Sequence, residues 1–173
     1  DVFASPMICD PLHVRDCCLA TDGAGAVVMT IAERARDLRS RPIRLLGYGE
    51  AQQSWLIAEM EDATWLKPAA MSSERAFGMA GVKRSDIDVL GIYDSFTITV
   101  LLTLEALGYC GRGDAAAFIQ GGRIAPGGAL PVNTTGGGLS CMHPGMYGLF
   151  LIIEAVRQLR GECGARQIDN AKL

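Results

Sequence analysis

The stretch SDIDVLGIYDSFTITVLLTLEALGYC, residues 85–110, decides the class of fold. Its residues 88–93 form a short apolar run behind a turn, which is the pattern of a buried strand. The residues that follow are enough for a helix and are apolar nearly all round, so this helix is expected to be buried. Asp94 or Ser95 can cap its start, and Gly108 fits just past its end. A buried strand that leads directly into a buried helix indicates an α/β protein.

The same alternation of strand and helix continues upstream of this stretch. The sequence predicts buried strands at Ala26–Thr30 and at 43–48, and helical segments at 31–40 and 71–82. Pro42 ends the first helical segment, because the residue before a proline is pushed out of the helical conformation.

A last helix is predicted in HPGMYGLFLIIEAVRQLRGECG, residues 143–164. Pro144 stands where a first helical residue would be, and Gly161 stands just past the end, which is the usual placement of these two residue types. Arg157 and Arg160 fall in the last turn, where positive charge suits the helix dipole. The chain therefore ends in an amphipathic helix with a wide apolar face.

Composition favours one folded domain and excludes several classes of protein. Of the 173 residues, 49% are hydrophobic and 20% are charged, which suffices for a core. The net charge of −3 comes without a basic stripe, so nucleic acid is excluded as a partner. No apolar run reaches the roughly 18 residues of a membrane-spanning helix.

The cysteines and the two ends of the chain also bear on its context. Six cysteines without any CxxC spacing are typical of free thiols in a reducing compartment, so a cytoplasmic protein is predicted. The chain does not begin with Met, and it stops where another strand would begin. We therefore expect a piece of a longer protein, whose other catalytic residues can lie outside this sequence.

The loop GGGLSCMHPGMYG, residues 136–148, holds one of the two histidines in the chain. His143 is predicted at or next to the start of the last helix. Glycines allow close backbone approach, and free N–H groups at a helix start can hold an anion or a developing oxyanion. An imidazole titrates near neutral pH, so His143 can act as a base or as a donor. The alternative is a loop histidine that only bonds a nearby backbone group.

Two further groupings contain cysteine. Cys141 could serve as a nucleophile activated by His143, but two residues of extended chain separate their Cα atoms by about 6–7 Å, which disfavours a local pair. A small buried residue is the favoured interpretation of Cys141. His13 with Cys17 and Cys18 lacks a fourth ligand at a suitable spacing, so no metal site is predicted.

Tyr93 is a second candidate for a functional side chain. A strand would deliver it to the carboxyl edge of the sheet, where α/β proteins place their ligands. The alternative is that Tyr93 packs in the interior and Asp94 caps the following helix. The pattern of residues leaves both open.

The order of these motifs resembles the C-terminal half of thiolases. It runs through DPLHVRDCCLATDGAGAVVMT, GYGEA, DIDVLGIYDSF, GGALPVNTTGGGLSCMHPGMYG and EAVRQLRGECGARQ, and it covers essentially the whole chain. The likeness is strongest to sterol-carrier-protein-type thiolases and thiolase-like lipid-transfer proteins. Each motif alone is weakly specific, and their combination is considerably more so.

This resemblance implies an α/β fold of five layers, αβαβα, built from two similar halves with mixed sheets flanked by helices. Residues 1–42 would be the end of the first half, with its final strand and helix. Residues 43–173 would be the C-terminal domain without its last strands.

The resemblance also implies roles for particular residues. The nucleophilic cysteine that takes the acyl group from coenzyme A lies in the first half of the family's fold, so it is expected outside this chain. His143 matches the loop histidine that activates this cysteine. Tyr93-Asp94-Ser95-Phe96 matches the strand-end motif whose first residue helps to hold a water in the oxyanion site.

Backbone groups of the same loop are expected to bind the oxyanion or the substrate. The candidates lie on both sides of Cys141 and are Gly136, Gly137, Gly138, Pro144 and Gly145. Their region would supply N–H donors aimed at the charge that develops on a thioester oxygen.

One position departs from the thiolase pattern. Thiolases have Asn or His where this chain has Tyr93, whereas steroid side-chain aldolases of the same superfamily have Tyr there. The aldolases cleave a β-hydroxyacyl-CoA and work with a small accessory protein. They also carry a further tyrosine in the later loop, where this chain has Met142 or a neighbour. His143 thus favours a thiolase, and Tyr93 favours an aldolase.

Three functions follow as hypotheses. The first is a thiolase-like acyl-CoA acyltransferase of the acetyl-CoA acetyltransferase type, acting in lipid, sterol or fatty acyl-CoA metabolism. The second is a retro-aldolase, and the third is a non-catalytic lipid-binding scaffold. The substrate of either enzyme would be a coenzyme A thioester, with no covalently bound cofactor and no metal. A second copy or a complementary chain is expected to cover the unpaired strand edges of the fragment.

Overall fold

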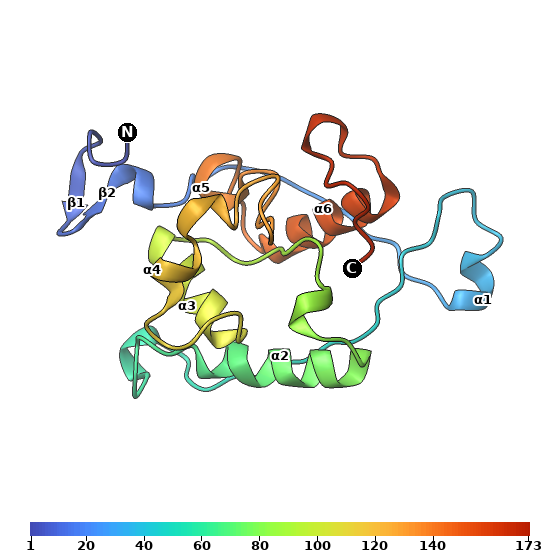
Figure 1. The fold of residues 1–173 in the computed structure, drawn as a ribbon, viewed down its shortest axis with the longest axis horizontal. Coiled ribbons are helices and arrows are strands. Elements are labelled where there is room, and N and C mark those ends of the chain that lie inside the picture. The colour runs from blue at the N-terminus through green and yellow to red at the C-terminus, as the bar shows by residue number, and fades with distance from the viewer.

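The computed structural model describes residues 1–173 as helices joined by long extended segments (Figure 1). In chain order the elements are β1 (Met7–Cys9), β2 (Leu12–His13), α1 (Ala32–Ala35), α2 (Lys67–Ala80), α3 (Thr97–Ala106), α4 (Ala115–Phe118), α5 (Gly137–Ser140) and α6 (Gly148–Arg160). Short 3₁₀ turns lie at Val14–Asp16, Ile57–Glu59, Arg84–Asp86, Gln120–Gly122 and Gly164–Arg166. The β1–β2 hairpin lies at one end of the molecule and α1 at the other.

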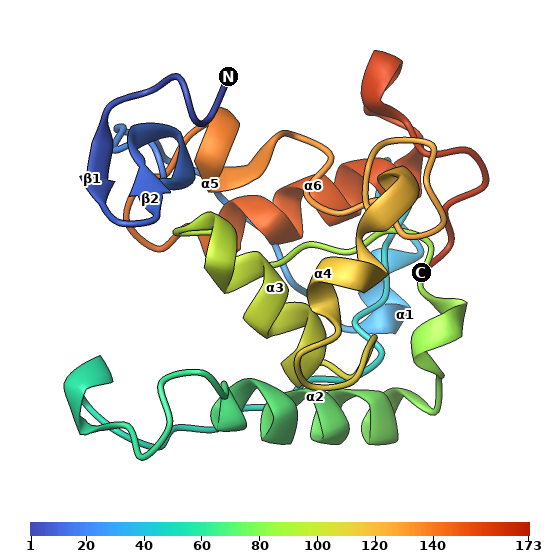
Figure 2. The ribbon, with the colours of Figure 1, turned by 60° about the vertical axis from the view of Figure 1, so that its left-hand side comes forward.

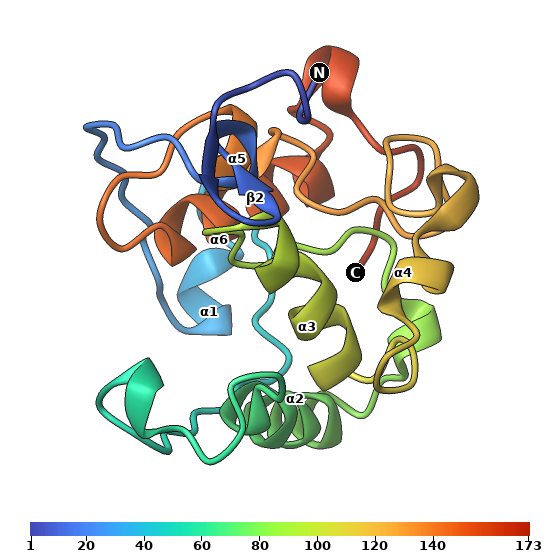
Figure 3. The same ribbon diagram turned by 90° about the vertical axis from the view of Figure 1, so that its left-hand side faces the viewer.

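Helix α3 occupies the middle of the molecule, between α2 and α6 (Figures 2 and 3). The prediction that this helix is buried holds for its last turn, where Leu104, Glu105 and Ala106 are buried. Leu104 is fully buried and forms the core with Ile92 and Leu130. This packing fixes the end of the segment 88–93, which carries Tyr93 and Asp94 into the candidate site.

The predicted mixed sheet is the main correction. The sheet of this chain is the small antiparallel β1–β2 pair, with Met7 opposite His13. The segments 26–30 and 43–48 are not strands, because their backbone groups have no hydrogen-bonded neighbour in the chain. Segment 88–93 forms no ladder: it has one parallel bridge between Leu90 and Val132, and Asp88 and Val89 donate to the carbonyl of Leu173. The α/β class holds, with a sheet smaller than expected.

The ends of the helices follow the sequence in part. Helix α6 begins at Gly148, so neither His143 nor Pro144 starts it. The reason is Met146, whose φ of 57° is left-handed and interrupts a helix that would otherwise begin earlier. The C-terminus is as predicted, with Gly161 at a φ of 78° just past the last turn.

Two other predicted helices differ in length from those observed. The segment 31–40 forms only the single turn of α1, Ala32–Ala35. The predicted helix at 71–82 is α2, which begins four residues earlier at Lys67 with a proline in its first turn. None of the helices is both long and apolar enough to cross a membrane.

The extended segment before α2 passes very close to that helix. A Cβ atom added at Gly47 would lie 2.3 Å from the carbonyl oxygen of Ala76, and one added at Gly49 would lie 2.0 Å from that of Ser72. Only glycine fits at such a distance from backbone, so these two residues let the extended segment lie against α2.

Candidate active site

Three aromatic rings come together where segment 88–93 meets the 136–148 loop. The ring centroids of Tyr93 and His143 lie 5.2 Å apart, and those of His143 and Tyr147 lie 5.5 Å apart in a stacked arrangement. Tyr147 also stacks on Phe150 at 6.2 Å. The structure therefore brings together the imidazole and the phenol that the sequence singled out separately.

Tyr147 is the residue that sequence reasoning missed. Its side chain is only 3% exposed, and its ring lies next to both His143 and Tyr93. Burial raises the pKa of Tyr147 to about 12, with a contribution from the charge of Asp94 that outweighs the opposing hydrogen bond with Thr135. Its phenol is therefore a neutral group at physiological pH.

His143 is held by its backbone as well as by its ring. Its N–H donates to Oγ1 of Thr21 at 3.0 Å, and it forms a parallel bridge with Ala20. The ring packs against the backbone of Gly138, where an added Cβ would lie 2.7 Å from Cδ2 of His143. The Nε2 atom of His143 is buried and has no hydrogen-bond partner. A buried imidazole nitrogen without a partner is costly unless a further group meets it.

Tyr93 is half-exposed, with 47% of its surface accessible, and Asn133 holds the backbone of the residue before it, Ile92. The N–H of Ile92 donates to Oδ1 of Asn133, and Nδ2 of Asn133 donates to the carbonyl of Ile92, both at 2.9 Å. Asn133 has a left-handed φ of 48°, which asparagine tolerates better than most residues. The side chain thus ties the residue before Tyr93 to the start of the loop.

Asp94 points the other way and is only 2% exposed. Its Oδ1 accepts the N–H of Gly138 at 2.8 Å, and its Oδ2 accepts the N–H of Leu139 at 3.3 Å. The prediction that Asp94 or Ser95 caps α3 is wrong, because the N-cap of α3 is Phe96 and no side chain bonds there. The carboxylate instead accepts hydrogen bonds at the N-terminus of α5, where Gly138 lies 44 residues further along the chain.

The N–H groups of the three loop glycines are engaged within the protein. Gly136 donates to the carbonyl of Asn133 at 2.8 Å, and Gly137 donates to Oγ1 of Thr135 at 3.2 Å. Gly138 donates to Asp94. These N–H groups shape the loop and are not available to an oxyanion.

Free N–H groups lie instead on the far side of His143. Pro144 is buried and has no N–H, whereas the amides of Gly145, Met146 and Tyr147 donate to no group in the chain. Leu149 and Phe150 in the first turn of α6 donate to the carbonyls of Met146 and Tyr147. The unpaired amides therefore lie just before this 13-residue helix. Amides of this kind can stabilise a developing negative charge.

Of the expectations for the cysteines, the burial of Cys141 is wrong. Cys141 is exposed rather than buried, and its thiol makes no hydrogen bond with His143. Its backbone N–H donates to the carbonyl of Gly137 at 3.0 Å. No set of three or more His, Cys, Asp or Glu side chains is gathered in a metal-binding arrangement, at His13, Cys17 and Cys18 or elsewhere.

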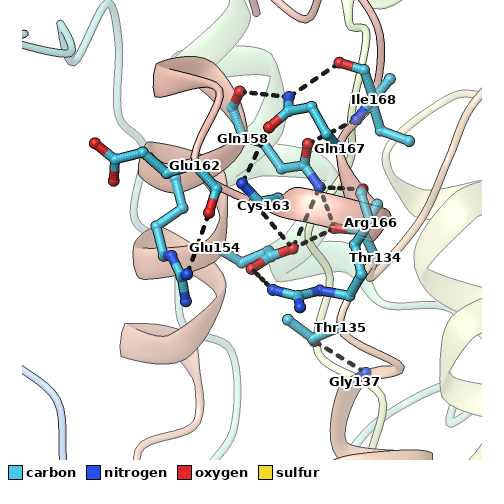
Figure 4. Close-up of polar contacts among 11 residues, drawn as sticks. Thr134, Thr135, Gly137, Glu154, Gln158, Glu162, Cys163, Arg166, Gln167 and Ile168 are labelled. Carbon is cyan, nitrogen blue, oxygen red and sulfur yellow. Dashed lines mark hydrogen bonds and ion pairs between the residues drawn. The ribbon is translucent and has the colours of Figure 1, made fainter.

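A buried polar network lies next to the residues that lead into the loop (Figure 4). Oε1 of Glu154 accepts hydrogen bonds from Thr134 at 2.7 Å, from Gln158 at 3.3 Å and from the Cys163 thiol at 3.6 Å. Oε2 accepts from Arg166 at 3.2 Å. Burial would raise the pKa of Glu154, but the hydrogen bonds from Thr134 and Arg166 outweigh it and hold the pKa below its usual 4.5. The ending QLRGECGARQ thus anchors the residues that lead into the Gly-rich run.

Comparison with known proteins identifies the family. A family model described as "Thiolase C-terminal domain-like" matches residues 49–173. The chain belongs to this family. The predicted resemblance to thiolases is therefore confirmed, and with it the α/β class of the fold.

Curated relatives of this thiolase-family chain carry different activities in their names. It is 38% identical to the 17-hydroxy-3-oxo-4-pregnene-20-carboxyl-CoA lyase of Mycobacterium tuberculosis, over 91% of this chain and 41% of the relative. It is 33% identical to the acetyl-CoA acetyltransferase of Methanothermobacter thermautotrophicus, over 99% of this chain and 45% of the relative. The chain therefore spans less than half the length of these relatives.

A solved structure supports the same family as the relatives found by sequence. A chain of the structure named "Ltp2-ChsH2(DUF35) aldolase" superposes with a TM-score of 0.83 and 34% sequence identity. The match covers 97% of this thiolase-family chain and 44% of that chain. The fold of the family thus extends over nearly all residues of this chain.

Proposed function

We propose that the chain supplies the C-terminal part of an enzyme that makes or breaks a carbon–carbon bond beside a coenzyme A thioester. The observation that carries this proposal is the pairing of His143 with Tyr93, 5.2 Å between ring centroids, with the Nε2 atom of His143 buried and unpartnered. Such chemistry needs a proton-transfer group and hydrogen-bond donors at the thioester oxygen. Imidazole, phenol and the free amides at Gly145–Tyr147 are groups of these kinds.

The first form of this function is thiolase-type acyl transfer, as in acetyl-CoA acetyltransferases. A cysteine from outside this chain would attack the thioester, and His143 would take the thiol proton through Nε2. The relative from Methanothermobacter thermautotrophicus bears this activity in its name. No covalently bound cofactor or metal is needed, because the thioester substrate itself brings the coenzyme A.

The test is His143→Ala in the full-length protein. Removing one oxyanion or proton-transfer group costs about 10²–10³ in rate, so we expect at least that loss of kcat in acyl transfer. His13→Ala is the matched control, because His13 is the other histidine of the chain and lies in the N-terminal hairpin. Near-normal turnover of His143→Ala in a folded protein would contradict the proposed role.

The second form is retro-aldol cleavage of a β-hydroxyacyl-CoA, and the position of Tyr93 favours it. The phenol is half-exposed beside the imidazole, so it could exchange the proton of a substrate hydroxyl while the carbon–carbon bond breaks. The relative from Mycobacterium tuberculosis and the matching solved structure are a lyase and an aldolase by name.

Tyr93→Phe separates the two forms of the function. In an aldolase it should abolish lyase turnover and leave folding intact, because only the hydroxyl is lost. In a thiolase it should lower acyl transfer by about 10²-fold or less, the effect of one lost donor. Tyr48→Phe, an exposed tyrosine elsewhere on the surface, is the control. Full lyase activity in Tyr93→Phe would exclude the aldolase mechanism, and a folded wild-type protein inactive in both assays would leave a non-catalytic lipid-binding scaffold.

We also propose that a complementary chain or a second copy covers part of this surface. Val28 is 89% exposed and Leu45 is 67% exposed, and both lie on extended segments without backbone partners. Apolar side chains on unpaired extended backbone are a surface that other chains can pair with. A small accessory protein, the division into residues 1–42 and 43–173, and a cytoplasmic location remain parts of the same proposal.

A further inference from the structure

We propose that Asp94 is a positioning residue that sets the imidazole of His143 against the phenol of Tyr93. The proposal rests on the proposed function, because it assigns Asp94 a role in holding that same pair. Tyr93 and Asp94 are neighbours in the chain, yet one side chain is 47% exposed and the other 2% exposed. One residue therefore faces the site while the next reaches into the loop that carries His143.

The carboxylate of Asp94 holds the loop through two backbone donors. It accepts the N–H groups of Gly138 at 2.8 Å and Leu139 at 3.3 Å, which are the second and third residues of α5. No other acceptor serves these two amides, and a charged acceptor at a helix start bonds more strongly than a neutral one. The hydrogen bonds therefore link the end of one segment to a loop more than 40 residues away.

The contact continues from Asp94 to the imidazole through Gly138. A Cβ atom added at Gly138 would lie 3.1 Å from Oδ1 of Asp94 and 2.7 Å from Cδ2 of His143. The backbone of Gly138 is thus wedged between the carboxylate and the imidazole ring. The ring also stacks on Tyr147, so a shift of Gly138 would displace His143 relative to Tyr93.

Close packing around the carboxylate limits which residue can occupy this position. A Cβ atom added at Gly137 would lie 2.0 Å from Oδ2 of Asp94 and 2.9 Å from Nδ2 of Asn133. A longer acid would collide with the loop backbone, and a side chain without an oxygen would leave two buried N–H groups unpaired. The position therefore requires both the short side chain and the negative charge of aspartate.

The first experiment replaces Asp94→Asn in the full-length protein. The amide keeps the shape but turns a donor toward one of the two N–H groups, so α5 and His143 should shift. A misplacement of about 1 Å can cost about 10²-fold in rate, so we expect kcat to fall by 10- to 100-fold while KM stays within about twofold. Asp16→Asn is the matched control, because Asp16 is a buried carboxylate that accepts His13 N–H and the Thr97 hydroxyl.

A second measurement does not depend on activity. The Tyr93 and His143 rings are close enough for a nuclear Overhauser contact, which should weaken or vanish in Asp94→Asn and persist in Asp16→Asn. If the wild-type protein had no acyl-CoA activity and the contact were still lost in Asp94→Asn, the proposed function would fail and the positioning role would stand. A folded Asp94→Asn protein that keeps both its kcat and the ring contact would overturn the inference.

A second variant covers the case in which Asp94→Asn does not fold. Gly138→Ala keeps the Asp94 side chain itself and places a new Cβ 2.7 Å from Cδ2 of His143, the closer of its two contacts. The same loss of kcat and of the ring contact is expected. A folded Gly138→Ala protein with normal kcat and an unchanged ring contact would equally overturn the role of this contact path.

Discussion

At the scale of single residues, Tyr147 changes the picture of the site most. Its ring stacks on those of His143 and Phe150, with interplanar angles of 19° and 12°. It packs against the imidazole, which also contacts Gly138. The neutral phenol adds no charge next to His143 and Tyr93 at physiological pH, because burial raises its pKa to about 12.

This shift predicts how stability depends on alkaline pH. The pKa of Tyr147 is raised from 10.0 in the reference state to about 12 in the folded protein. Folding therefore favours the neutral phenol, so the stabilisation is fully present below pH 10 and is lost as the pH rises toward 12. Denaturant unfolding between pH 9 and pH 12 should show a steeper loss of stability in the wild type than in Tyr147→Phe. Equal slopes for the two proteins would contradict this account.

The candidate residues could be predicted from sequence only in part, for reasons that are local. His143 and Tyr93 stand out because each follows a recognisable pattern, a Gly-rich loop and the end of an apolar run. Tyr147 does not, since left-handed Met146 breaks the spacing that would relate it to His143. The role of Asp94 depends on Gly138, 44 residues away, and nothing in the local sequence indicates that contact.

At the scale of elements, the approach of the extended segment to α2 gives a matched pair of glycine variants. In Gly49→Ala the new Cβ would meet the Ser72 carbonyl oxygen at 2.0 Å, so the segment must move, at a cost of about 1–3 kcal/mol. In Gly78→Ala the new Cβ meets nothing within 4 Å inside α2, so the higher helix propensity of alanine should stabilise by about 0.5–1 kcal/mol.

Urea unfolding of both variants measures the two free energies directly. Opposite signs are expected for the same chemical change. A Gly49→Ala protein as stable as the wild type would show that the extended segment does not lie against α2 in solution.

Helices were more predictable than strands in this chain, because a helix makes its hydrogen bonds within itself. The apolar pattern alone located α2, α3 and α6, and Gly108 and Gly161 marked the ends of the last two. A strand depends on a neighbour that can come from anywhere in the fold. The segments 26–30 and 43–48 have the composition of strands, yet no neighbouring backbone in this chain pairs with them.

At the scale of the whole molecule, the order of motifs carried more information than any single one. The alternation of apolar runs and helices gave the α/β class, and the sequence of the five motifs gave the family, which the match over residues 49–173 confirms. The chain covers 44% of the matching solved chain. Its extended segments carry exposed apolar residues such as Val28 and Leu45, the surface on which the proposed second chain is expected to pack.

Two parts of the structure, the hydrophobic core and the buried polar network, support the candidate site. The core of Ile92, Leu104 and Leu130 fixes the end of segment 88–93, and the network around Glu154 fixes the start of the 136–148 loop. Asp94 and Asn133 tie these two parts together. We propose that this framework holds the imidazole of His143 and the phenol of Tyr93 against the same substrate.

A double-mutant cycle on kcat/KM tests this claim most directly, with His143→Ala, Tyr93→Phe and the combined variant of the full-length protein. Groups that act together on one reacting centre lose rate non-additively, because the second removal costs little once the first is gone. We predict that the combined variant is little slower than the more damaged single variant. A combined loss equal to the product of the two single losses would mean that the two rings act independently, and would contradict a shared site.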